Sequence, residues 1–413
     1  MNLLYTITSY PPAIGGAQLY FHHLAKALSK EHVVQVATHW DTNRVDWLLG
    51  TTLRASSISR RYCVDGIPVY QMGISAPAKV RALLGLASYP LAQRRAVAWL
   101  SAALVDQLGL MARGSDVIHN NRIGREPISY ASFQLARRLG IPFVFTPNHH
   151  PRWVGWWYEV YLDLYRQADA LIALTRAERD TYVALGVDPA RVHVVGASGF
   201  LADTAHPRAF RDRYQINGNI VLFVGQKFEY KGLDRILAAA PKVWARHPDT
   251  HFVFIGPRTP YSVGLFSRPQ DSRILELGSI GPQEKTDAMA ACDIYCMPST
   301  QESFGQVFVE AWTLGKPVIG ADIPAERELI GDGVDGFVVR PGTDELTNRI
   351  VTLLDSPDMR ARMGQAGHEK AVTEFSMERI AARTTDAYEA AIRNVRSTKG
   401  RIGYRAASAR ALA

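Results

Sequence analysis

Hydrophobic positions in the first half of the chain alternate between short apolar runs and segments with the period of amphipathic helices. The apolar runs predict β-strands at 2–8, 33–38, 116–119, 142–146 and 170–174, and the helical segments include 17–29 and 129–139. Thr175 and Glu178 follow the last run in the spacing of a capping box, so we expect another helix to begin there. Strands that alternate with helices predict a parallel sheet with right-handed crossovers.

A second series of strands and helices follows a break in periodicity at 199–218. Its predicted strands lie at 220–224, 251–255, 294–297 and 317–320, and its predicted helices at 233–246, 284–291 and 306–314. We therefore predict two α/β domains with parallel sheets. They occupy 1–200 and 219–376, with a linker at 201–218 and, at 377–413, a helix that packs back towards the amino-terminal domain and a basic tail. Such sheets bind ligands at the carboxyl ends of their strands, so we expect a site in the cleft between the domains.

Length and composition fit this division. The chain has 413 residues, of which 47% are hydrophobic and 21% charged, as in globular proteins of two or three domains. We find no apolar run long enough for a membrane-spanning helix and no basic segment before 3–8 as in a signal peptide, so we expect a cytoplasmic protein. The three cysteines, Cys63, Cys292 and Cys296, have no metal-ligand or redox spacing. We therefore expect them to be small hydrophobic side chains of a protein in a reducing compartment.

The net charge of +8 leaves three classes of partner open: nucleic acid, an anionic membrane, or an anionic small molecule. No nucleic-acid-recognition signature is found, which favours phosphate-bearing ligands or lipids. Basic and apolar residues mix at 79–86 and 94–100, as in helices that rest on an anionic membrane, and this would make the protein peripheral at the inner membrane face. Aromatic residues at 153–158 would stack on a sugar acceptor or lie at the lipid interface. Core packing explains the basic and apolar segments, and these aromatic residues, equally well.

The segment 299–320 has the strongest pattern of a binding site. A buried strand ends at Pro298, a polar loop through Glu302 and Gly305 follows, and a helix then begins. Amides at a helix start bind anions and sugar hydroxyls readily, and glycine lets the backbone approach a ligand closely. Glu310 lies in this helix among apolar residues, where a carboxylate needs hydrogen-bond donors that ligand hydroxyls would supply.

A second candidate segment, 221–232, runs from a strand into a loop with Lys227 and Lys231 and then into a helix. Cations beside a helix start can bind a diphosphate and stabilise it as it leaves. In the loop after the first strand, Gly16 allows backbone amides to approach a pyrophosphate or an acceptor.

Three histidines follow strands of the first domain: His149 and His150 come after 142–146, and His119 ends 116–119. No carboxylate or third histidine accompanies the adjacent pair at ligand spacing, so we expect no metal site. Which of His149 and His150 is functional is left open, with His150 favoured, and His119 is expected to line the cleft.

This ordered set of motifs resembles the retaining glycosyltransferases of family 4, which have the GT-B fold of two Rossmann-like domains with sheets that face each other across a cleft. The resemblance implies that Glu302 contacts hydroxyls of the donor sugar, helped by the backbone amides of Ser303, Phe304 and Gly305. It implies that Glu310 holds the ribose hydroxyls of the nucleotide.

The resemblance also assigns the phosphate, base and histidine positions. Lys231 matches the family's phosphate-binding lysine, whereas Gln226 stands where arginine is usual, so either Gln226 or its neighbour Lys227 replaces that residue. Ile280 lies where the family contacts the nucleobase, and nothing in the sequence separates uracil from guanine. A histidine near the donor sugar corresponds to His150 or His149.

The implied activity is transfer of a hexose from a UDP- or GDP-linked sugar to an acceptor hydroxyl with retention of configuration, in glycan or glycolipid assembly. The partners would be the nucleoside-diphosphate sugar and a sugar or lipid-linked acceptor, with no nucleic acid and no required cofactor or metal. Two alternatives remain: a sugar-nucleotide epimerase or phosphorylase of the same fold, and a catalytically silent subunit of a glycan-assembly complex.

Overall fold

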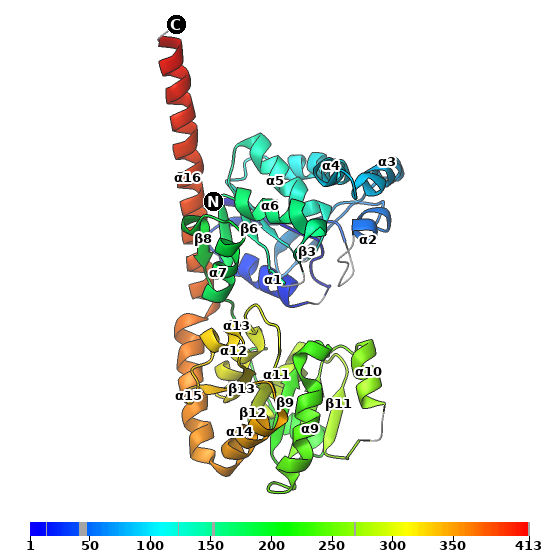
Figure 1. The fold of residues 1–413 in the computed structure, drawn as a ribbon, viewed down its shortest axis with the longest axis vertical. Helices are drawn as coiled ribbons and strands as arrows, with labels where there is room; N and C mark the ends of the chain where they lie inside the picture. The colour runs from blue at the N-terminus through cyan, green and yellow to red at the C-terminus, as the bar shows by residue number, and fades with distance from the viewer. Residues whose placement is uncertain (14, 41–47, 123, 151–152, 268–269, 412–413) are drawn as a thin grey trace. The chain divides into compact units, whose positions relative to one another are not determined.

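The chain folds into two compact units, the first formed by Met1–Val195 and Ile380–Ala413 and the second by Gly196–Arg379 (Figure 1). This is a computed structural model, and it describes residues 1–13, 15–40, 48–122, 124–150, 153–267 and 270–411. The chain therefore enters the second unit once and returns to the first for its last helix. None of the described helices is long and apolar enough to cross a membrane.

The first unit contains an eight-stranded sheet among its described residues, in the order β3-β4-β2-β1-β5-β6-β7-β8. Among these described strands, β3 and β4 pair antiparallel and the other neighbours pair parallel. The strands are β1 (Asn2–Ile7), β2 (Val33–Thr38), β3 (Arg60–Val64), β4 (Ile67–Gln71), β5 (Val117–Asn121), β6 (Phe143–Thr146), β7 (Ala170–Ala173) and β8 (Val192–Val194). Strand order reverses between β1 and β5. Ligands of such sheets usually bind beyond the carboxyl ends of the two strands at this reversal point.

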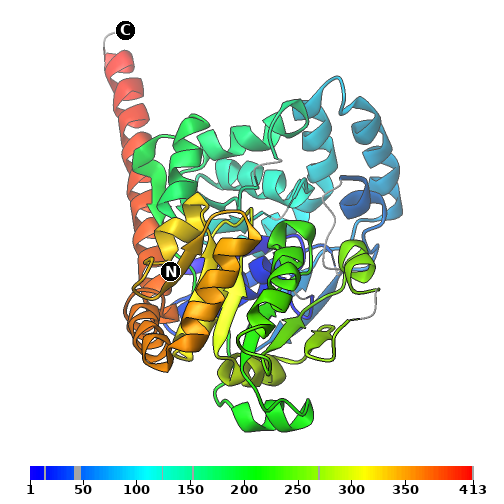
Figure 2. The same cartoon turned by 60° about the horizontal axis from the view of Figure 1, so that its bottom comes forward.

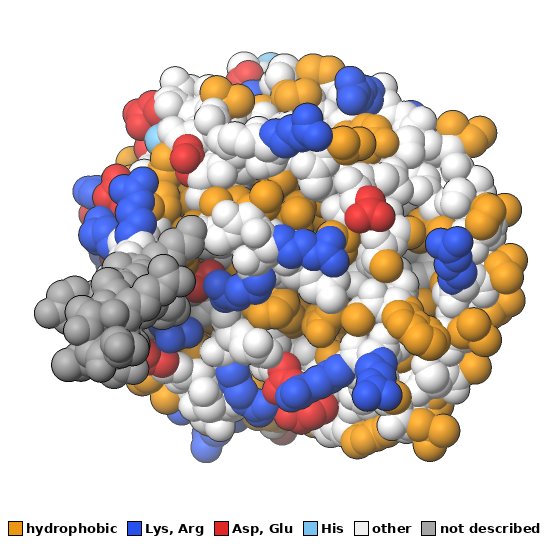
Figure 3. Space-filling model, turned by 90° about the horizontal axis from the view of Figure 1, so that it is seen from above, with side chains coloured by type: hydrophobic (Ala, Val, Ile, Leu, Met, Phe, Trp, Pro, Cys, Tyr) orange, Lys and Arg blue, Asp and Glu red, His pale blue; other side chains and the backbone are white. Residues whose placement is uncertain are grey.

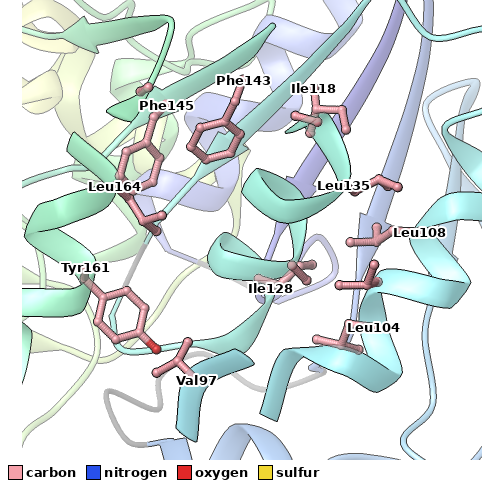
Figure 4. Packing of buried hydrophobic residues seen from close by; sticks show 14 of the residues in the cluster. Val97, Leu104, Leu108, Ile118, Ile128, Leu135, Phe143, Phe145, Tyr161 and Leu164 are labelled. Atoms are coloured by element: carbon pink, nitrogen blue, oxygen red, sulfur yellow. The ribbon is translucent and has the colours of Figure 1, made fainter. Parts of the chain in front are cut away.

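Helices cover both faces of this sheet because successive strand residues point to opposite sides. Leu4 packs into a core formed with α4, α5 and α6 (Figure 4), whereas the next residue, Tyr5, stacks on Phe21 of α1. The helices are α1 (Gly16–Leu28), α2 (Leu48–Leu53), α3 (Ala76–Ser88), α4 (Gln93–Met111), α5 (Pro127–Leu139), α6 (Glu159–Gln167), α7 (Arg176–Ala184) and α16 (Met377–Ala411), with short 3-10 helices η1 (Trp156–Tyr158) and η2 (Pro189–Arg191).

In the part of the second unit that the structure describes, six strands form a parallel sheet in the order β11-β10-β9-β12-β13-β14. Its strands are β9 (Ile220–Val224), β10 (His251–Ile255), β11 (Ile274–Leu277), β12 (Ile294–Met297), β13 (Val318–Ala321) and β14 (Gly336–Val339). This is the strand order of a Rossmann fold, and the order reverses between β9 and β12. Ligands of such sheets bind beyond the carboxyl ends of these two central strands.

Helices of the second unit pack in pairs: α9 with α14, α8 with α11, and α12 with α15. The first pair is seen side by side in Figure 2, in green and orange. The helices are α8 (Pro207–Arg213), α9 (Leu233–Trp244), α10 (Pro260–Phe266), α11 (Pro282–Ala291), α12 (Gln306–Thr313), α13 (Pro324–Leu329), α14 (Thr343–Asp355) and α15 (Pro357–Glu374), with the 3-10 helix η3 (Glu229–Lys231).

The segment 201–218, which we expected to be a linker, is part of the second unit. It contains α8, whose Phe210 is buried, and Ile216 beyond the helix is buried as well. Arg211 fixes the helix by donating to the carbonyl oxygens of Gly218 and Ala291, both at 2.7 Å. The arginines and a proline led us to predict a loop here, but the segment packs against the rest of the second unit through its two buried apolar side chains.

Candidate nucleotide-sugar site

The loop after β9 places Lys231 beside the loop after β12. Thr300 of the second loop donates its backbone N–H to the carbonyl oxygen of Tyr230 at 2.7 Å. Gly232 lies in the left-handed region, with φ of 74°, and a Cβ there would lie 2.5 Å from the carbonyl oxygen of Pro298. The two loops are therefore in backbone contact, and only glycine fits at position 232.

Lys231 and Glu302 form an ion pair across this contact, with side chains that are 13% and 14% exposed. Burial lowers the pKa of Lys231, but the Glu302 carboxylate more than offsets this effect, so the pKa lies above its usual value. Ser299 also donates to Glu302, at 3.4 Å. The predicted pair of Glu302 and Lys231 is thus brought together at the reversal point of the sheet, as a cation and an anion that remain partly open to solvent.

Helix α12 begins directly after Gly305, which lies in the left-handed region with φ of 87°. A Cβ at this glycine would lie 2.6 Å from the ring of Phe308, so the turn into the helix requires glycine. Phe304 is buried and packs edge-on against Phe375, which leaves its backbone, not its ring, for a ligand. Ser303 is half-buried. These positions agree with a role for backbone amides at the helix start.

Glu310 is 3% exposed and is held by partners from two other segments. Its Oε1 accepts hydrogen bonds from the Phe200 amide at 3.0 Å and from Lys285 of α11 at 2.7 Å. Its Oε2 is buried and has no partner among the described residues. Gly199 makes this packing possible, because a Cβ there would lie 2.8 Å from Cγ of Glu310. One carboxylate oxygen therefore remains to be satisfied, and a ligand hydroxyl would do so.

Lys227 differs from our expectation that it binds a phosphate. Its side chain is fully buried, and its ammonium donates to the Glu276 carboxylate and to the Leu277 carbonyl oxygen. Burial lowers the pKa of Lys227. Glu276 lies on the edge strand β11, a partner that the sequence around position 227 does not reveal. Gln226 precedes it and is half-buried.

Ile280, the expected nucleobase contact, is half-buried in the loop between β11 and α11. Gly16 is the first residue of α1 and is exposed at the helix start, at the reversal point of the first sheet. Both lie at carboxyl ends of strands, as the sequence predicted for ligand contacts. Among the described residues, no group of three or more metal-ligating side chains is found.

His149 lies in the interior of the first unit, directly beyond β6. Its ring Nδ1 lies 3.2 Å from the Tyr165 hydroxyl, and its backbone N–H donates to the Glu178 carboxylate at 3.2 Å. Burial, with a smaller contribution from the Arg122 charge, lowers its pKa to about 4. The ring is therefore neutral at physiological pH. His150 is half-buried, with its ring centroid 6.0 Å from that of Trp153.

His119 differs from our expectation that it lines the cleft. It is fully buried, with Nδ1 2.6 Å from the Tyr388 hydroxyl and Nε2 2.8 Å from the Thr146 hydroxyl. Burial lowers its pKa to about 3. Because both ring nitrogens already have partners, His119 packs α16 against the sheet and presents neither nitrogen to an acceptor.

The structure shows two further side chains near this site, Lys285 and Glu326. Lys285 was not singled out because a lysine on an exposed helix pattern resembles any solvated charge. Glu326 is fully buried, with Oε2 bonded to the Ala321 amide and Oε1 without a partner among the described residues. Burial, and then the nearby Glu302 charge, raise its pKa well above the usual value. Glu326 is therefore a buried carboxyl that interacts electrostatically with both members of the Lys231–Glu302 pair.

Two α/β units with largely parallel sheets, and a charged pair at the reversal point of the second sheet, define the class as a two-domain α/β protein. Solved structures share this architecture. The Anabaena protein HepE, in complex with UDP and glucose, has a TM-score of 0.72 at 20% identity, covering 94% of this chain and 99% of HepE. Sucrose-phosphate synthase from Thermosynechococcus elongatus has a TM-score of 0.70 at 18% identity, covering 94% and 98%. The fold is GT-B.

Family models cover both units. The model "Glycosyl transferase 4-like domain" matches residues 15–197, and the model "Glycosyl transferases group 1" matches residues 208–370. The chain therefore belongs to the group 1 glycosyltransferases with a family 4-like amino-terminal domain, and it is a glycosyltransferase.

Several characterised relatives are glycosyltransferases. The MMP alpha-(1->4)-mannosyltransferase of Mycolicibacterium hassiacum is 28% identical over 312 residues, covering 68% of this chain and 72% of the relative. Alpha-D-kanosaminyltransferase of Streptomyces kanamyceticus is 28% identical over 285 residues, covering 63% and 73%. Phosphatidyl-myo-inositol mannosyltransferase of Mycobacterium tuberculosis is 30% identical over 220 residues, covering 52% and 57%.

Proposed function

We propose that the protein transfers a hexose from a nucleoside-diphosphate sugar to an acceptor hydroxyl, with retention of anomeric configuration. The observation that carries this proposal is the Lys231–Glu302 pair at the carboxyl ends of β9 and β12, next to the helix that bears Glu310. A donor has three kinds of group that fit these residues: sugar hydroxyls, phosphates and ribose hydroxyls.

Each donor group finds a partner of suitable charge. Glu302 accepts from the sugar hydroxyls, and the Lys231 ammonium binds the diphosphate that it faces once the donor separates the ion pair. The unpartnered Oε2 of Glu310 accepts from ribose hydroxyls. Binding of the donor would thus give a hydrogen bond to a buried oxygen that has no partner among the described residues. Contacts with the ligand would replace the Lys231–Glu302 ion pair that the donor separates.

The chemical step breaks the bond between the anomeric carbon and the diphosphate oxygen, and the diphosphate leaves with the electron pair. The acceptor oxygen bonds to the anomeric carbon on the same face, and its proton passes to the departing phosphate. Lys231 and the amides at the start of α12 stabilise the charge that develops on the leaving group. Because Lys227 is committed to Glu276, Lys231 carries more of this stabilisation than we expected from the sequence.

Turnover of UDP-, GDP- and ADP-sugars with glycan and glycolipid acceptors tests the proposal, with and without EDTA because we expect no metal requirement. Glu302→Ala and Lys231→Ala should each lower kcat/KM about a hundredfold or more, since each removes several kcal/mol of transition-state stabilisation. Lys242→Ala is the matched control, because Lys242 lies on α9 in an exposed ion pair with Asp344. It should leave kcat/KM unchanged.

Three outcomes would contradict the proposal. Unchanged turnover of Glu302→Ala would remove the site, and a product of inverted configuration by NMR would remove retention. Conversion of the donor without any acceptor would show an epimerase or a phosphorylase instead.

A further inference from the structure

The stretch from 66 to 105 in the first unit contains no aspartate or glutamate, yet it contains the four cations Lys79, Arg81, Arg94 and Arg95. It covers β4, α3 and the first half of α4. Arg81, Arg94 and Arg95 are exposed. The first acidic residue after this stretch is Asp106, in the second half of α4. A stretch that has four cations and no anion attracts negatively charged surfaces.

Large hydrophobic side chains are exposed on the same hairpin. On α3, Val80, Leu83 and Leu84 are 65%, 51% and 64% exposed. Leu91, in the connection to α4, is 91% exposed, and Trp99 on α4 is 57% exposed. Isolated exposed hydrophobes are ordinary, but several within twenty residues of one hairpin mark an interaction site.

An aromatic pair from η1 extends this surface. Trp156 and Trp157 are 51% and 48% exposed. Their backbone carbonyl oxygens accept from Gln93 at 2.6 Å and from the Tyr89 hydroxyl at 2.7 Å, and the rings of Tyr89 and Trp157 are stacked. η1 is thus attached beside the α3–α4 connection. We call the exposed residues of α3, of the connection, of α4 up to Trp99 and of η1 the hairpin surface.

The base of η1 is fixed from inside the unit. Trp153, unlike the two tryptophans after it, is buried, and the guanidinium of the buried Arg122 lies 4.7 Å from its ring centroid. Arg122 also donates to the Tyr165 hydroxyl at 2.9 Å. Of these three tryptophans, Trp153 is therefore the one that core packing explains. Its fixed position keeps Trp156 and Trp157 directed outward.

A hollow of about 390 Å³ opens between the start of α4, η1 and α6, and its lining includes Leu91, Arg94, Arg95 and Trp156. Two acidic residues, Glu159 and Asp163, lie in the same lining. Glu159 is paired with Arg166, and Asp163 with Arg94 and Arg166, so Arg95 is the lining cation that these pairs do not involve. Figure 3 views the molecule from the side on which α3, α4 and α5 lie in Figure 1, and shows hydrophobic and basic side chains intermixed, with acidic side chains also present among them. An arginine pair beside apolar walls fits a phosphate head group and the chain attached to it.

We propose that the hairpin surface docks on an anionic phospholipid bilayer. Leucine and tryptophan enter the interfacial layer, while the arginines bind head-group phosphates. A second copy of the chain would place the same cations against each other in a symmetric interface, which like charges disfavour. This inference concerns a partner, and it stands whether or not the proposed donor site is correct.

Co-sedimentation of the full chain with vesicles tests the proposal without any sugar turnover. The protein should bind vesicles of phosphatidylcholine and phosphatidylglycerol, bind pure phosphatidylcholine much less, and dissociate at high salt. The triple variant Arg81→Gln, Arg94→Gln, Arg95→Gln should weaken binding to anionic vesicles roughly tenfold to a hundredfold. The double variant Leu84→Ser, Leu91→Ser should also weaken it, although the charge is unchanged.

Matched controls come from the second unit: Arg362→Gln removes an exposed arginine, and Val263→Ser removes a valine that is 56% exposed. Neither should change vesicle binding. Absence of binding to anionic vesicles, or equal losses in the controls, would overturn the proposal. Light scattering distinguishes a further outcome: a dimer that Leu84→Ser, Leu91→Ser dissociates would assign the surface to contacts between copies and would also overturn it.

Discussion

Glu178 lies in the interior of the first unit, where its carboxylate accepts hydrogen bonds from the amides of Leu174 and His149 and from the Tyr182 hydroxyl. Its own amide donates to Thr175 at 3.0 Å, so half of the expected capping box is present. The carboxylate does not return to Thr175, but instead joins the ends of β6 and β7. Burial raises the pKa of Glu178 to about 7, although the three donors oppose this shift.

This pKa makes the stability of the first unit depend on pH. The ordinary value of 4.5 applies to the unfolded chain, so the favourable contribution is complete below pH 4.5 and is lost as pH rises towards about 7. The loss is on the order of 3 kcal/mol, because one pKa unit corresponds to about 1.4 kcal/mol. Glu178→Gln should therefore gain stability relative to the wild type between pH 5 and pH 8, as measured by urea unfolding. An equal difference at both pH values would contradict the buried, un-ionised state.

Single residues were predictable where their role follows from neighbours in sequence. Glu302 and Lys231, which the structure places in contact, were candidates because each lies in a loop between a strand and a helix start, and Glu310 because a carboxylate among apolar helix residues needs partners. Lys285 was not a candidate, since its surroundings come from segments distant in sequence. The same reason explains why the buried ion pair of Lys227 was not predicted, because its partner Glu276 is 49 residues away in the sequence.

At the scale of elements, the contact between the β9 and β12 loops determines the position of Lys231. Gly232→Ala should destabilise the second unit by about 1–3 kcal/mol, because the residue has a positive φ and the new Cβ would meet the Pro298 carbonyl oxygen. It should also lower kcat/KM at least tenfold by displacing Lys231. Thermal unfolding and donor turnover measure the two effects.

Gly264→Ala provides the control for this prediction. Gly264 lies within α10, and a Cβ there would meet nothing within 4 Å. Alanine should stabilise the protein by about 0.4–1 kcal/mol by restricting the unfolded chain, with kcat/KM unchanged. If both glycine variants behaved alike, the loop contact would not be what positions Lys231.

Central strands were predictable and edge strands were not. β1, β9 and β12 are almost entirely buried on both faces and consist mainly of apolar residues. β5 is fully buried too, but only its first two residues, Val117 and Ile118, are apolar. β3 lies at the sheet edge with its side chains exposed or half-buried, and β8 has only three residues. Neither leaves a hydrophobic pattern, so the antiparallel β3–β4 pair was missed.

At the scale of the whole molecule, the last helix joins the first strand. The Tyr388 hydroxyl lies 2.6 Å from the hydroxyl of Tyr5 and 2.6 Å from Nδ1 of His119, and all three residues are buried. Tyr388→Phe would leave two buried polar groups with one partner fewer, which costs about 1–3 kcal/mol for each group. The variant should lower the free energy of unfolding by that order in a urea titration.

Tyr130→Phe is the control for Tyr388→Phe, because the Tyr130 side chain is half-buried and its hydroxyl has no hydrogen bond among the described residues. It should leave the free energy of unfolding within about 0.5 kcal/mol of the wild type. Equal effects of the two variants would show that the Tyr5–Tyr388–His119 contacts contribute nothing specific.

The path of the chain, which leaves the first unit after Val195 and re-enters it at Ile380, has a practical consequence for engineering. In genetic terms the second unit is an insert, so a chimaera that exchanges donor preference between related enzymes needs two splice points instead of one. A single crossover near residue 196 would combine the carboxyl-terminal helix of one parent with the sheet of the other. Tyr5, His119 and Tyr388, which form hydrogen bonds where this helix meets the sheet, would then have to be taken from the same parent.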